Sequence, residues 1–471
     1  MVMVKVYPKY KDSGAPWFGE VPSHWQTLRL GSVLRERKET NKANDVTKIL
    51  SVMKDIGVIP YEEKGRVGNK CSEDITRYKI VRPGDIVANC MNIIIGSVGL
   101  SKYTGCLSPV YYVLTPRSQE DDSRFFDYVF KIKSFQLSLV RLGNGILAHR
   151  MRIPMELLKC ETVPKPPAEE QRVIVEYLGS FNKIFRRYIR EKQKTIKLLN
   201  EQKQAVINRA ITKGINPNVR LKSSGFGWMG DVPKHWEVRR LKNFLLEPLK
   251  YGANEAAELT DRTPPRYIRI TDIDKNGNLV DSSFRSLPID IAEPYLLQEG
   301  DILLARSGAT VGKSFLYFNS YGSSAYAGYL IRARINPNIV SFAFFYNYLQ
   351  SSAYWTWVSL MTIQATIQNV SAEKYGCLPV PVPPCQEQEL ILKKIANDCR
   401  PFDELICASH KDIEFMREYR IRLISDVVTG KIDVRDIKLP EIEDITDSEQ
   451  IEEREISEDL EDTEEVVNAD E

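Results

Sequence analysis

The feature that most constrains the fold of this chain is that long stretches of its sequence occur twice. Residues 13–30 read SGAPWFGEVPSHWQTLRL, and residues 224–241 read SGFGWMGDVPKHWEVRRL. Further along, VPKPPAEEQ at 163–171 matches VPVPPCQEQ at 380–388. Because these landmarks follow one another in the same order in both halves, we interpret the chain as an internal duplication with two similar folds.

Each half is expected to contain a compact part followed by a long helix. Short β-rich runs with Gly and Pro turns, at 78–87, 266–270 and 301–305, indicate a mixed globule. The Pro-Pro pair that follows, with Glu residues just after it, is typical of the beginning of a helix. The first helix should run to about Lys213 and the second to about Val428, which makes each roughly 68 Å long.

Apolar side chains recur along both helices at steps of three and four residues, which indicates an imperfect heptad seam. The seam positions are Ile174, Leu178, Phe185, Tyr188, Leu199 and Val206 in the first helix and Ile391, Ile395, Phe402, Leu405, Met416 and Leu423 in the second. A helix of this length cannot bury its stripe alone, so we expect the two helices to pair in opposite directions. The alternative is that each helix packs separately on its own globule.

The predicted fold class is therefore α+β: two tandem α/β globules joined by two long helices that form an antiparallel coiled coil, as a pseudo-two-fold internal repeat. The expected segments are a lead-in at 1–23, a first globule at 24–165, a central helix at 166–213, a linker at 214–235, a second globule at 236–382, a C-terminal helix at 383–431 and a tail at 432–471.

Charge is unevenly distributed along the chain. Residues 441–471 hold 16 acidic residues and one basic residue, so the remaining chain carries a net charge of +17 although the total is +2. A basic body suits a polyanionic partner such as nucleic acid, because Lys and Arg neutralise phosphates. The acidic tail, poor in aromatic residues, is expected to be disordered.

Cysteine and histidine usage favours the cytoplasm and excludes two kinds of small scaffold. None of the eight cysteines forms a C-x-x-C pair and only four histidines occur, so neither a disulfide framework nor a zinc knuckle is indicated. The first residues lack the pattern of a signal peptide. We therefore expect a cytoplasmic protein with reduced thiols and no bound metal.

Polar side chains on two kinds of loop are candidates for contacting DNA. Arg306 lies on a turn after the β-rich run at 301–305, and an arginine can grip guanine O6 and N7 together. Loops just before each Pro-Pro helix carry Asn and Gln, which can bond adenine. The candidates are Arg306, Ser307, Gly308, Thr310, Lys313, Gln364, Thr366, Gln368 and Asn369 in the second half, and Asn89, Asn92, Arg141, Asn144, His149, Arg150 and Arg152 in the first. The alternative for each is a structural turn with an exposed polar side chain.

The strongest candidate for a catalytic site in this chain is Gly312-Lys313-Ser314, which resembles the end of a phosphate-binding loop. Such a loop requires a first glycine at 307, where this chain has Ser. An adenine-methylating box, a hydrolase elbow and a metalloprotease motif are all missing from the sequence. We therefore expect no catalytic residue, with nucleotide hydrolysis kept as an alternative. His24 and His235, at equivalent places beside tryptophans, are expected to position the chain.

The duplicated order of motifs resembles the specificity subunits of type I restriction–modification systems. The motifs that carry the resemblance are SG-x-x-W-x-G-x-VP-x-HW at 13–25 and 224–236, GDI at 84–86 and 300–302, and PP-x-x-EQ at 166–171 and 383–388, each followed by a long helix. The resemblance covers about residues 7–435. It implies that the globules are target recognition domains and that the helices are spacers that also dock partner subunits.

The resemblance also implies a non-catalytic role and a set of partners. The expected partners are double-stranded DNA carrying a bipartite asymmetric site, two DNA methyltransferase (modification) subunits, and restriction/translocase subunits, with no membrane. It implies that this chain binds no cofactor, and that S-adenosylmethionine and ATP with magnesium act in the partner subunits. Two alternatives are kept: a nucleotide-hydrolysing enzyme, and a protein adaptor that does not bind DNA.

Overall fold

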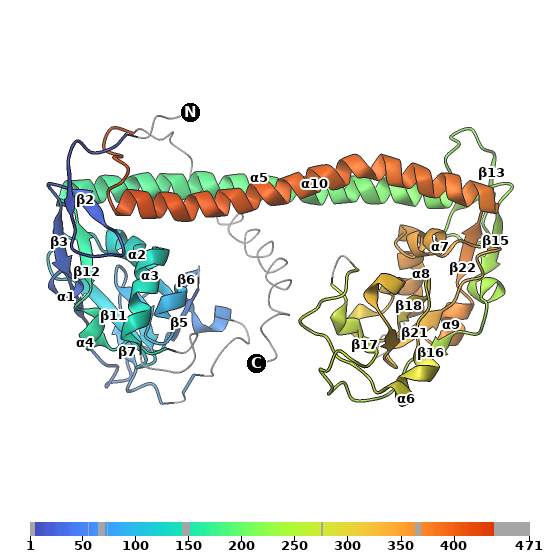
Figure 1. Cartoon of the computed structure of the whole chain (residues 1–471), viewed down its shortest axis with the longest axis horizontal. Helices are drawn as coiled ribbons and strands as arrows, with labels where there is room; N and C mark the ends of the chain where they lie inside the picture. The colour runs from blue at the N-terminus through green and yellow to red at the C-terminus, as the bar shows by residue number, and fades with distance from the viewer. Residues whose placement is uncertain are drawn as a thin grey trace. The chain divides into compact units, whose positions relative to one another are not determined.

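The computed structural model describes residues 5–54, 56–64, 71–72, 74–143, 151–274, 277–362 and 369–437. The chain divides into two compact units that interleave along the sequence. Among the described residues, the first unit combines those up to Arg190 with those from Lys411 to 437, and the second contains Glu191–His410. Each unit is thus made of one globule, one part of the central helix and one part of the C-terminal helix (Figure 1).

The same four-stranded antiparallel sheet occurs in both units. In the first unit its order is β4 (Leu34–Glu36), β11 (Tyr111–Pro116), β8 (Ile86–Asn89) and β9 (Val98–Leu100). In the second unit the order is β16 (Lys250–Tyr251), β21 (Leu330–Ala333), β18 (Ile302–Ala305) and β19 (Ser314–Leu316). The identical order of equivalent strands confirms that the duplicated sequence gives two similar folds.

Two-stranded pairs flank each central sheet. In the first unit they are β1 (Tyr10–Asp12) with β2 (Glu20–Pro22), β3 (Gln26–Arg29) with β12 (Thr162–Lys165), β5 (Leu50–Met53) with β6 (Gly57–Pro60), and β7 (Lys79–Val81) with β10 (Gly105–Leu107). In the second they are β13 (Leu221–Ser223) with β14 (Asp231–Pro233), β15 (Glu237–Arg240) with β22 (Pro379–Val382), and the parallel pair β17 (Arg266–Ile268) with β20 (Ser324–Tyr326). Since the other named strand pairs in the described chain are antiparallel, the globules are of the α+β class that the sequence predicted.

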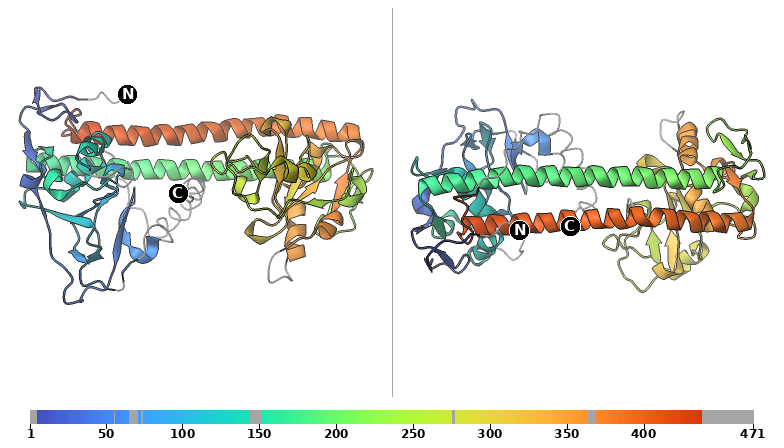
Figure 2. Two further views of the ribbon diagram at one scale, coloured as in Figure 1. Left: turned by 60° about the horizontal axis from the view of Figure 1, so that its bottom comes forward. Right: turned by 90° about the horizontal axis from the view of Figure 1, so that it is seen from above.

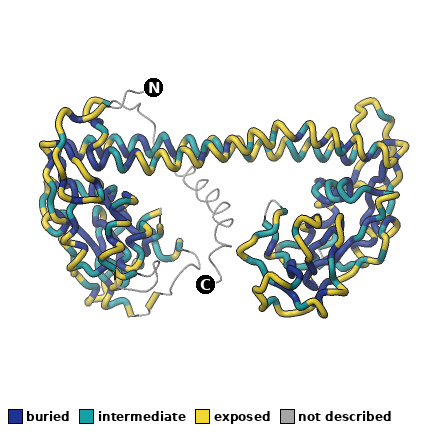
Figure 3. Tube along the Cα trace, viewed as in Figure 1, coloured by how far each residue is buried: buried dark blue, intermediate teal, exposed yellow. Residues whose placement is uncertain are grey.

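Helices cover the sheets and carry much of the buried surface. The shorter ones are α1 (Leu30–Val33), α2 (Ser123–Lys131), α3 (Lys133–Ser138) and α4 (Met155–Leu158) in the first unit, and α6 (Ile289–Ala292), α7 (Phe342–Tyr348), α8 (Ser352–Thr362) and α9 (Ala372–Gly376) in the second. Phe125, Phe126 and Phe130 of α2 are completely buried, as is Tyr354 of α8. Figure 3 shows the interior of each globule as buried chain. Within the described residues, no helix is both long enough and apolar enough to cross a membrane.

The repeated Gly-Asp-Ile motif shapes a tight turn at the beginning of a central strand. Gly84 and Gly300 have φ of +88° and +82°, a region that side chains with a Cβ rarely adopt. The carboxylate of Asp301 is 1% exposed, accepts a hydrogen bond from Gln298 N at 2.8 Å and pairs with Arg334 at 2.7 Å. Asp85 does the same with Arg82 N and Arg37. The motif is therefore a structural turn in both units.

The repeated PP-x-x-EQ and HW motifs fasten each globule to the beginning of a long helix. Gln171 is buried, donates to Pro166 O at 2.9 Å and accepts from the backbone N of Asp122, just before α2. Gln388 repeats these contacts with Pro383 O and Ser341 N, just before α7. The HW motifs also make equivalent contacts in both units: His24 lies 2.8 Å from Glu170, His235 lies 2.7 Å from Glu387, and Trp25 and Trp236 are completely buried. These contacts support the positioning role predicted for the histidines.

The two long helices are α5 (Ala168–Lys213) and α10 (Cys385–Val428). In the first unit, Arg420 donates to Asn182 at 2.8 Å, and the rings of Phe181 and Tyr419 lie 5.7 Å apart. In the second unit, Lys203 pairs with Asp403 at 2.6 Å. Within each unit the segments of α5 and α10 therefore lie side by side, as both views in Figure 2 also show.

Most of the predicted seam positions are buried or half-buried, and one is not. Ile174, Leu178, Phe185, Ile391, Ile395 and Leu423 are buried, and Tyr188, Leu199, Val206, Phe402 and Met416 are half-buried. Leu405 is 54% exposed, so its assignment to the seam was wrong. The buried stripe of α10 instead passes through Ile406, Ser409 and Ile413, because steps of four and three from Phe402 reach those positions and bypass Leu405.

The end of each long helix lies against the repeated VP-x-HW motif of its own unit. Gly214 and Gly430, with φ of +73° and +79°, end α5 and α10. A Cβ on Gly430 would lie 2.4 Å from Pro22, so only glycine permits this close approach. In the first unit, Asp433 N also donates to Lys5 O at 2.8 Å, which joins the chain after α10 to the lead-in.

Candidate nucleic-acid interface

Arg306 lies at the end of the central strand β18 and is held by its backbone on both sides. Its N donates to Tyr329 O at 3.0 Å, and its O accepts from Val370 N at 2.8 Å. Antiparallel hydrogen bonding of this kind fixes the direction in which the side chain leaves the sheet. The residue is half-buried, and Tyr329 beside it is 68% exposed.

The guanidinium of Arg306 is stacked on an aromatic ring, and its Nε is not hydrogen-bonded within the described residues. Its Cζ lies 4.8 Å from the centre of the Tyr251 ring, a cation–π distance. Its Nε is buried without a hydrogen-bond partner among the described residues. Tyr251 is itself fixed, because its hydroxyl accepts from Ala372 N at 3.0 Å. Two other arginines of this globule pair with a carboxylate, since Arg332 and Arg334 each contact Glu247 at 2.7 Å.

Asn369 lies opposite the Arg306 turn and also has an unused polar atom. An isolated antiparallel bridge pairs Asn369 with Ser307. The side-chain oxygen of Asn369 is buried without a partner in the described part of the chain. Two buried polar atoms without a partner in the described chain therefore lie close to this bridge, although Arg266 Nε and Arg332 Nε of the same globule are also without one.

The rest of the predicted second-half candidates surround this bridge or lie outside the described residues. Gly308 and Thr310 bound a short 3₁₀ turn, with φ of +77° at Gly308. Lys313 is exposed at the other end of that turn. Gln364, Thr366 and Gln368 lie outside the described residues.

The first-half candidates occupy the equivalent region of the first unit. Asn89 ends β8, and its side chain accepts from Met91 N at 3.1 Å. Asn92 begins the next turn, the 3₁₀ helix Ile93–Ile95, and is half-buried. Arg152 is exposed and lies beside the buried Cys90. Asn144, His149 and Arg150 lie outside the described residues.

Arg141 is less available than the other candidates. Its guanidinium pairs with both oxygens of Glu161, at 2.7 and 2.9 Å, and also donates to Ser138 O. The Glu161 side chain is 6% exposed. To contact a base, Arg141 would have to leave a buried carboxylate unpaired, which is costly.

Titratable groups near Arg152 respond to both burial and its charge. Burial raises the pKa of the Cys90 thiol, and Arg152 opposes that shift. Burial likewise raises the pKa of Tyr112, again opposed by Arg152. Both groups are therefore neutral near pH 7. No group of three His, Cys, Asp or Glu side chains able to hold a metal occurs within the described residues.

The Gly312-Lys313-Ser314 stretch does not form a phosphate-binding loop. Residues after the turn continue as the strand β19, whereas a phosphate loop leads into a helix whose N-terminus faces the phosphates. Gly312 N donates to Ala305 O at 3.1 Å, which closes a hairpin with β18. The alternative of nucleotide hydrolysis at this loop is therefore wrong.

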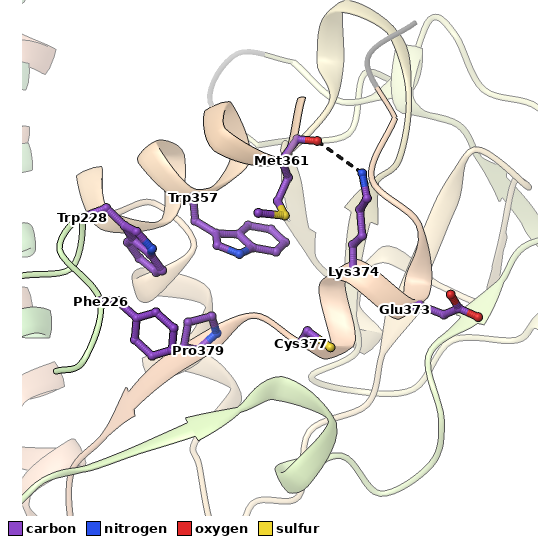
Figure 4. Close-up of a pocket in the computed structure, with 8 residues that line it drawn as sticks. All are labelled: Phe226, Trp228, Trp357, Met361, Glu373, Lys374, Cys377 and Pro379. Atoms are coloured by element: carbon purple, nitrogen blue, oxygen red, sulfur yellow. Dashed lines mark hydrogen bonds between the residues drawn. The ribbon is translucent and has the colours of Figure 1, made fainter. Parts of the chain in front are cut away.

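Sequence reasoning did not identify an open apolar recess in the second unit. Its volume is about 460 Å³, and Figure 4 shows three aromatic side chains around it. The lining residues are Phe226, Trp228, Trp357, Met361, Glu373, Lys374, Cys377 and Pro379. In the first unit, the equivalent tryptophan, Trp17, instead donates to Thr162 O at 2.9 Å.

Tyr251 and Tyr329, which lie beside Arg306, were also not predicted from the sequence, because isolated tyrosines far from Arg306 in sequence give no signal.

Comparison with known proteins gives two matches to one family model. A family described as the type I restriction modification DNA specificity domain matches residues 22–198 and again 233–406. A similar protein is the type I restriction enzyme MjaVIII specificity subunit of Methanocaldococcus jannaschii, 22% identical, with 88% of this chain and 95% of that protein covered. The putative MjaX specificity subunit of the same organism is also 22% identical, with coverage of 92% and 100%.

A solved structure shares the fold. It comes from a study of complex assembly and conformational transition of the type I R-M system, and it matches with a TM-score of 0.61. The match covers 88% of this chain and 99% of that chain at 14% sequence identity. The architecture of tandem globules with long helices is therefore shared with a chain that has diverged far in sequence.

Proposed function

This chain belongs to the type I restriction–modification DNA specificity family, and from that premise we propose that each globule recognises one half of a two-part DNA site. As a specificity subunit it is non-catalytic and supplies the sequence recognition of a modification and restriction complex. The observation that carries the proposal is the duplication itself. Two globules with the same sheet order but different surface residues suit two different half-sites.

The proposed DNA contacts are the side chains around the equivalent strand ends. In the second unit these are Arg306, Ser307, Thr310, Lys313 and Asn369. In the first unit they are Asn89, Asn92 and Arg152. Arg306 and Asn369 suit base edges, because they present unused donors and acceptors, whereas the exposed Lys313 suits a phosphate.

We further propose that α5 and α10 form an antiparallel coiled coil that sets the distance between the half-sites. The side-by-side packing of the two helices within each unit supports this. The helices would also dock two modification subunits, and through them the restriction subunits. In that complex S-adenosylmethionine and ATP with magnesium act in the partner subunits, and the complex works in the cytoplasm.

The test is to express the chain with its modification subunits and to map N6-methyladenine across the genome. We expect a single asymmetric motif with two specified halves and an unspecified spacer, present with this chain and missing without it. The same methylation pattern in both cells would refute the proposal.

A second measurement separates DNA recognition from a pure adaptor role. The assembled complex should be retained on a DNA carrying the mapped site at moderate salt, and should be released when either half is scrambled. Equal retention on intact and scrambled sites would favour the adaptor, whose basic charge binds any duplex.

A further inference from the structure

The two units share one backbone arrangement at the end of the central strand. In the second unit, Arg306 N bonds to Tyr329 O, and Val370 N bonds to Arg306 O. In the first unit, Cys90 N bonds to Val110 O at 3.4 Å, and Ile153 N bonds to Cys90 O at 2.9 Å. Since the sheet order is the same, Cys90 and Arg306 occupy the same place in their globules.

At this place each globule has one arginine, but the arginines come from opposite sides. In the second unit, Arg306 is on the central strand, and Asn369 faces it from the chain that precedes Val370. In the first unit, the central strand has the buried Cys90, and Arg152 is on the chain that precedes Ile153. Arginine and a smaller residue have thus exchanged positions between the two units.

Neither arginine is used to stabilise its own globule through a carboxylate. Within the described residues, no ion pair joins Arg152 or Arg306 to an acidic side chain. Arg306 instead stacks on Tyr251. Arg152 lies beside Tyr112, whose hydroxyl donates to Ile153 O at 2.8 Å. Arg306 is thus held by an aromatic ring, whereas Arg152 is held by the Cys90 thiol and the Tyr112 hydroxyl.

An exchange of this kind has a precedent within the same sheets. The buried carboxylates Asp85 and Asp301 are equivalent, yet their arginines come from different strands. Arg37 follows β4 in the first unit, whereas Arg334 follows β21 in the second. The fold therefore tolerates moving an arginine between neighbouring strands while its charge stays at the same place.

We propose that this strand-end place is a specificity-determining position in both globules, where Arg306 and Arg152 each read one guanine of their own half-site. The proposal rests on the proposed function and adds the residue and the base class. A guanidinium suits guanine because two of its donors match O6 and N7 in the major groove. Arg306 extends from the central strand, whereas Arg152 extends from the segment that faces it. Each would therefore approach its base pair from a different side, which gives related globules different target sequences.

The experiment uses the full complex with modification subunits and compares Arg306→Lys with Arg152→Lys. Lysine keeps the charge but loses the planar fork, so a phosphate contact survives and a two-point guanine contact does not. We expect Arg306→Lys to relax one guanine position in one half-site, and Arg152→Lys to relax one in the other. Discrimination at that position should fall by about 5- to 150-fold, the equivalent of one bidentate contact.

Arg240→Lys is the matched control, because Arg240 is exposed at the end of β15 and should leave the motif unchanged. In each variant the other half-site must stay fully specified, which shows that the protein is folded. Unchanged motifs in both variants, or relaxation of the same half-site by both, would overturn the inference while leaving the proposed function in place. If the unsubstituted complex showed no two-part motif, the proposed function would fail together with the inference.

Discussion

At the scale of single residues, the most informative contact is the stack of Arg306 on Tyr251. An arginine in solution has many rotamers, and fixing one on binding costs roughly 0.5–1.5 kcal/mol. Tyr251 reduces that cost in advance, because its ring lies 4.8 Å below the guanidinium and its hydroxyl is tied to Ala372 N. If Arg306 reads a base as proposed, we predict that Tyr251 is a positioning residue that acts through it.

Two substitutions of Tyr251 should distinguish the contribution of its ring to DNA affinity from that of its hydroxyl. Tyr251→Leu removes the stack and should weaken binding to the cognate site by about 2- to 30-fold, the range of a cation–π contact. Tyr251→Phe keeps the ring and should lose much less. The measurement is the affinity of the complex for the cognate site against a site altered only at the Arg306 position. Equal losses on both DNAs would mean that Tyr251 does not act through base recognition.

Acid should destabilise the first unit where the chain after α10 contacts the lead-in. The hydrogen bonds from Arg435 hold the pKa of Asp433 below its ordinary value of 3.8. A carboxyl with a lowered pKa stabilises the folded state above its ordinary pKa, and this contribution is lost as the pH falls through the lowered one. Asp433→Asn should therefore cost about 1–2 kcal/mol at pH 7 and nothing in strong acid. Thermal unfolding of both proteins over a pH series checks this, and a difference that does not shrink as the pH falls below 3.8 would contradict it.

At the scale of elements, the long helices show why a periodic pattern predicts a helix better than its buried face. The apolar positions of α10 predicted a helix with a seam, and Ile391, Ile395 and Leu423 are buried as expected. Leu405 and Ile406 are adjacent apolar residues, and the sequence alone does not decide which one belongs to the stripe. The continuous steps through Phe402, Ile406 and Ser409 decide it in the folded protein.

Two leucines of the same helix provide a matched pair for testing this. Leu423 is 4% exposed and packs in the core of the first unit, whereas Leu405 is 54% exposed. Leu423→Ala should lower the free energy of unfolding by about 2–5 kcal/mol because it leaves a cavity. Leu405→Ala should change it by less than about 0.5 kcal/mol. Urea unfolding of the two variants checks the difference, and similar losses would show that the stripe is assigned wrongly.

The repeated motifs explain how much of the fold could be predicted from the sequence. Gln171 and Gln388 make the same two hydrogen bonds in both units, so equal motifs indicate equal local structure. The proposed recognition residues behave differently, since Arg152 and Arg306 share a place but not a strand. A comparison of aligned sequence positions cannot find such an exchange, because the exchange depends on which segments of the chain lie side by side in the fold.

At the scale of the whole molecule, the central claim is that the paired helices determine the spacer between the half-sites. A variant that tests this should lose equal lengths from both helices, because the helix–helix contacts on either side of the deletion then stay in register. Deleting residues 192–198 of α5 together with 405–411 of α10 removes one heptad from each. At 1.5 Å a residue this shortens the pair by about 10 Å, or roughly 3 base pairs of DNA.

The most direct measurement of the claim is therefore the methylation motif of the complex that carries this double deletion. We expect both half-sites with their original bases and a spacer shorter by about 3 base pairs. The two intact half-sites serve as the control for folding. A motif whose spacer keeps its original length would contradict the claim that the helices set the distance.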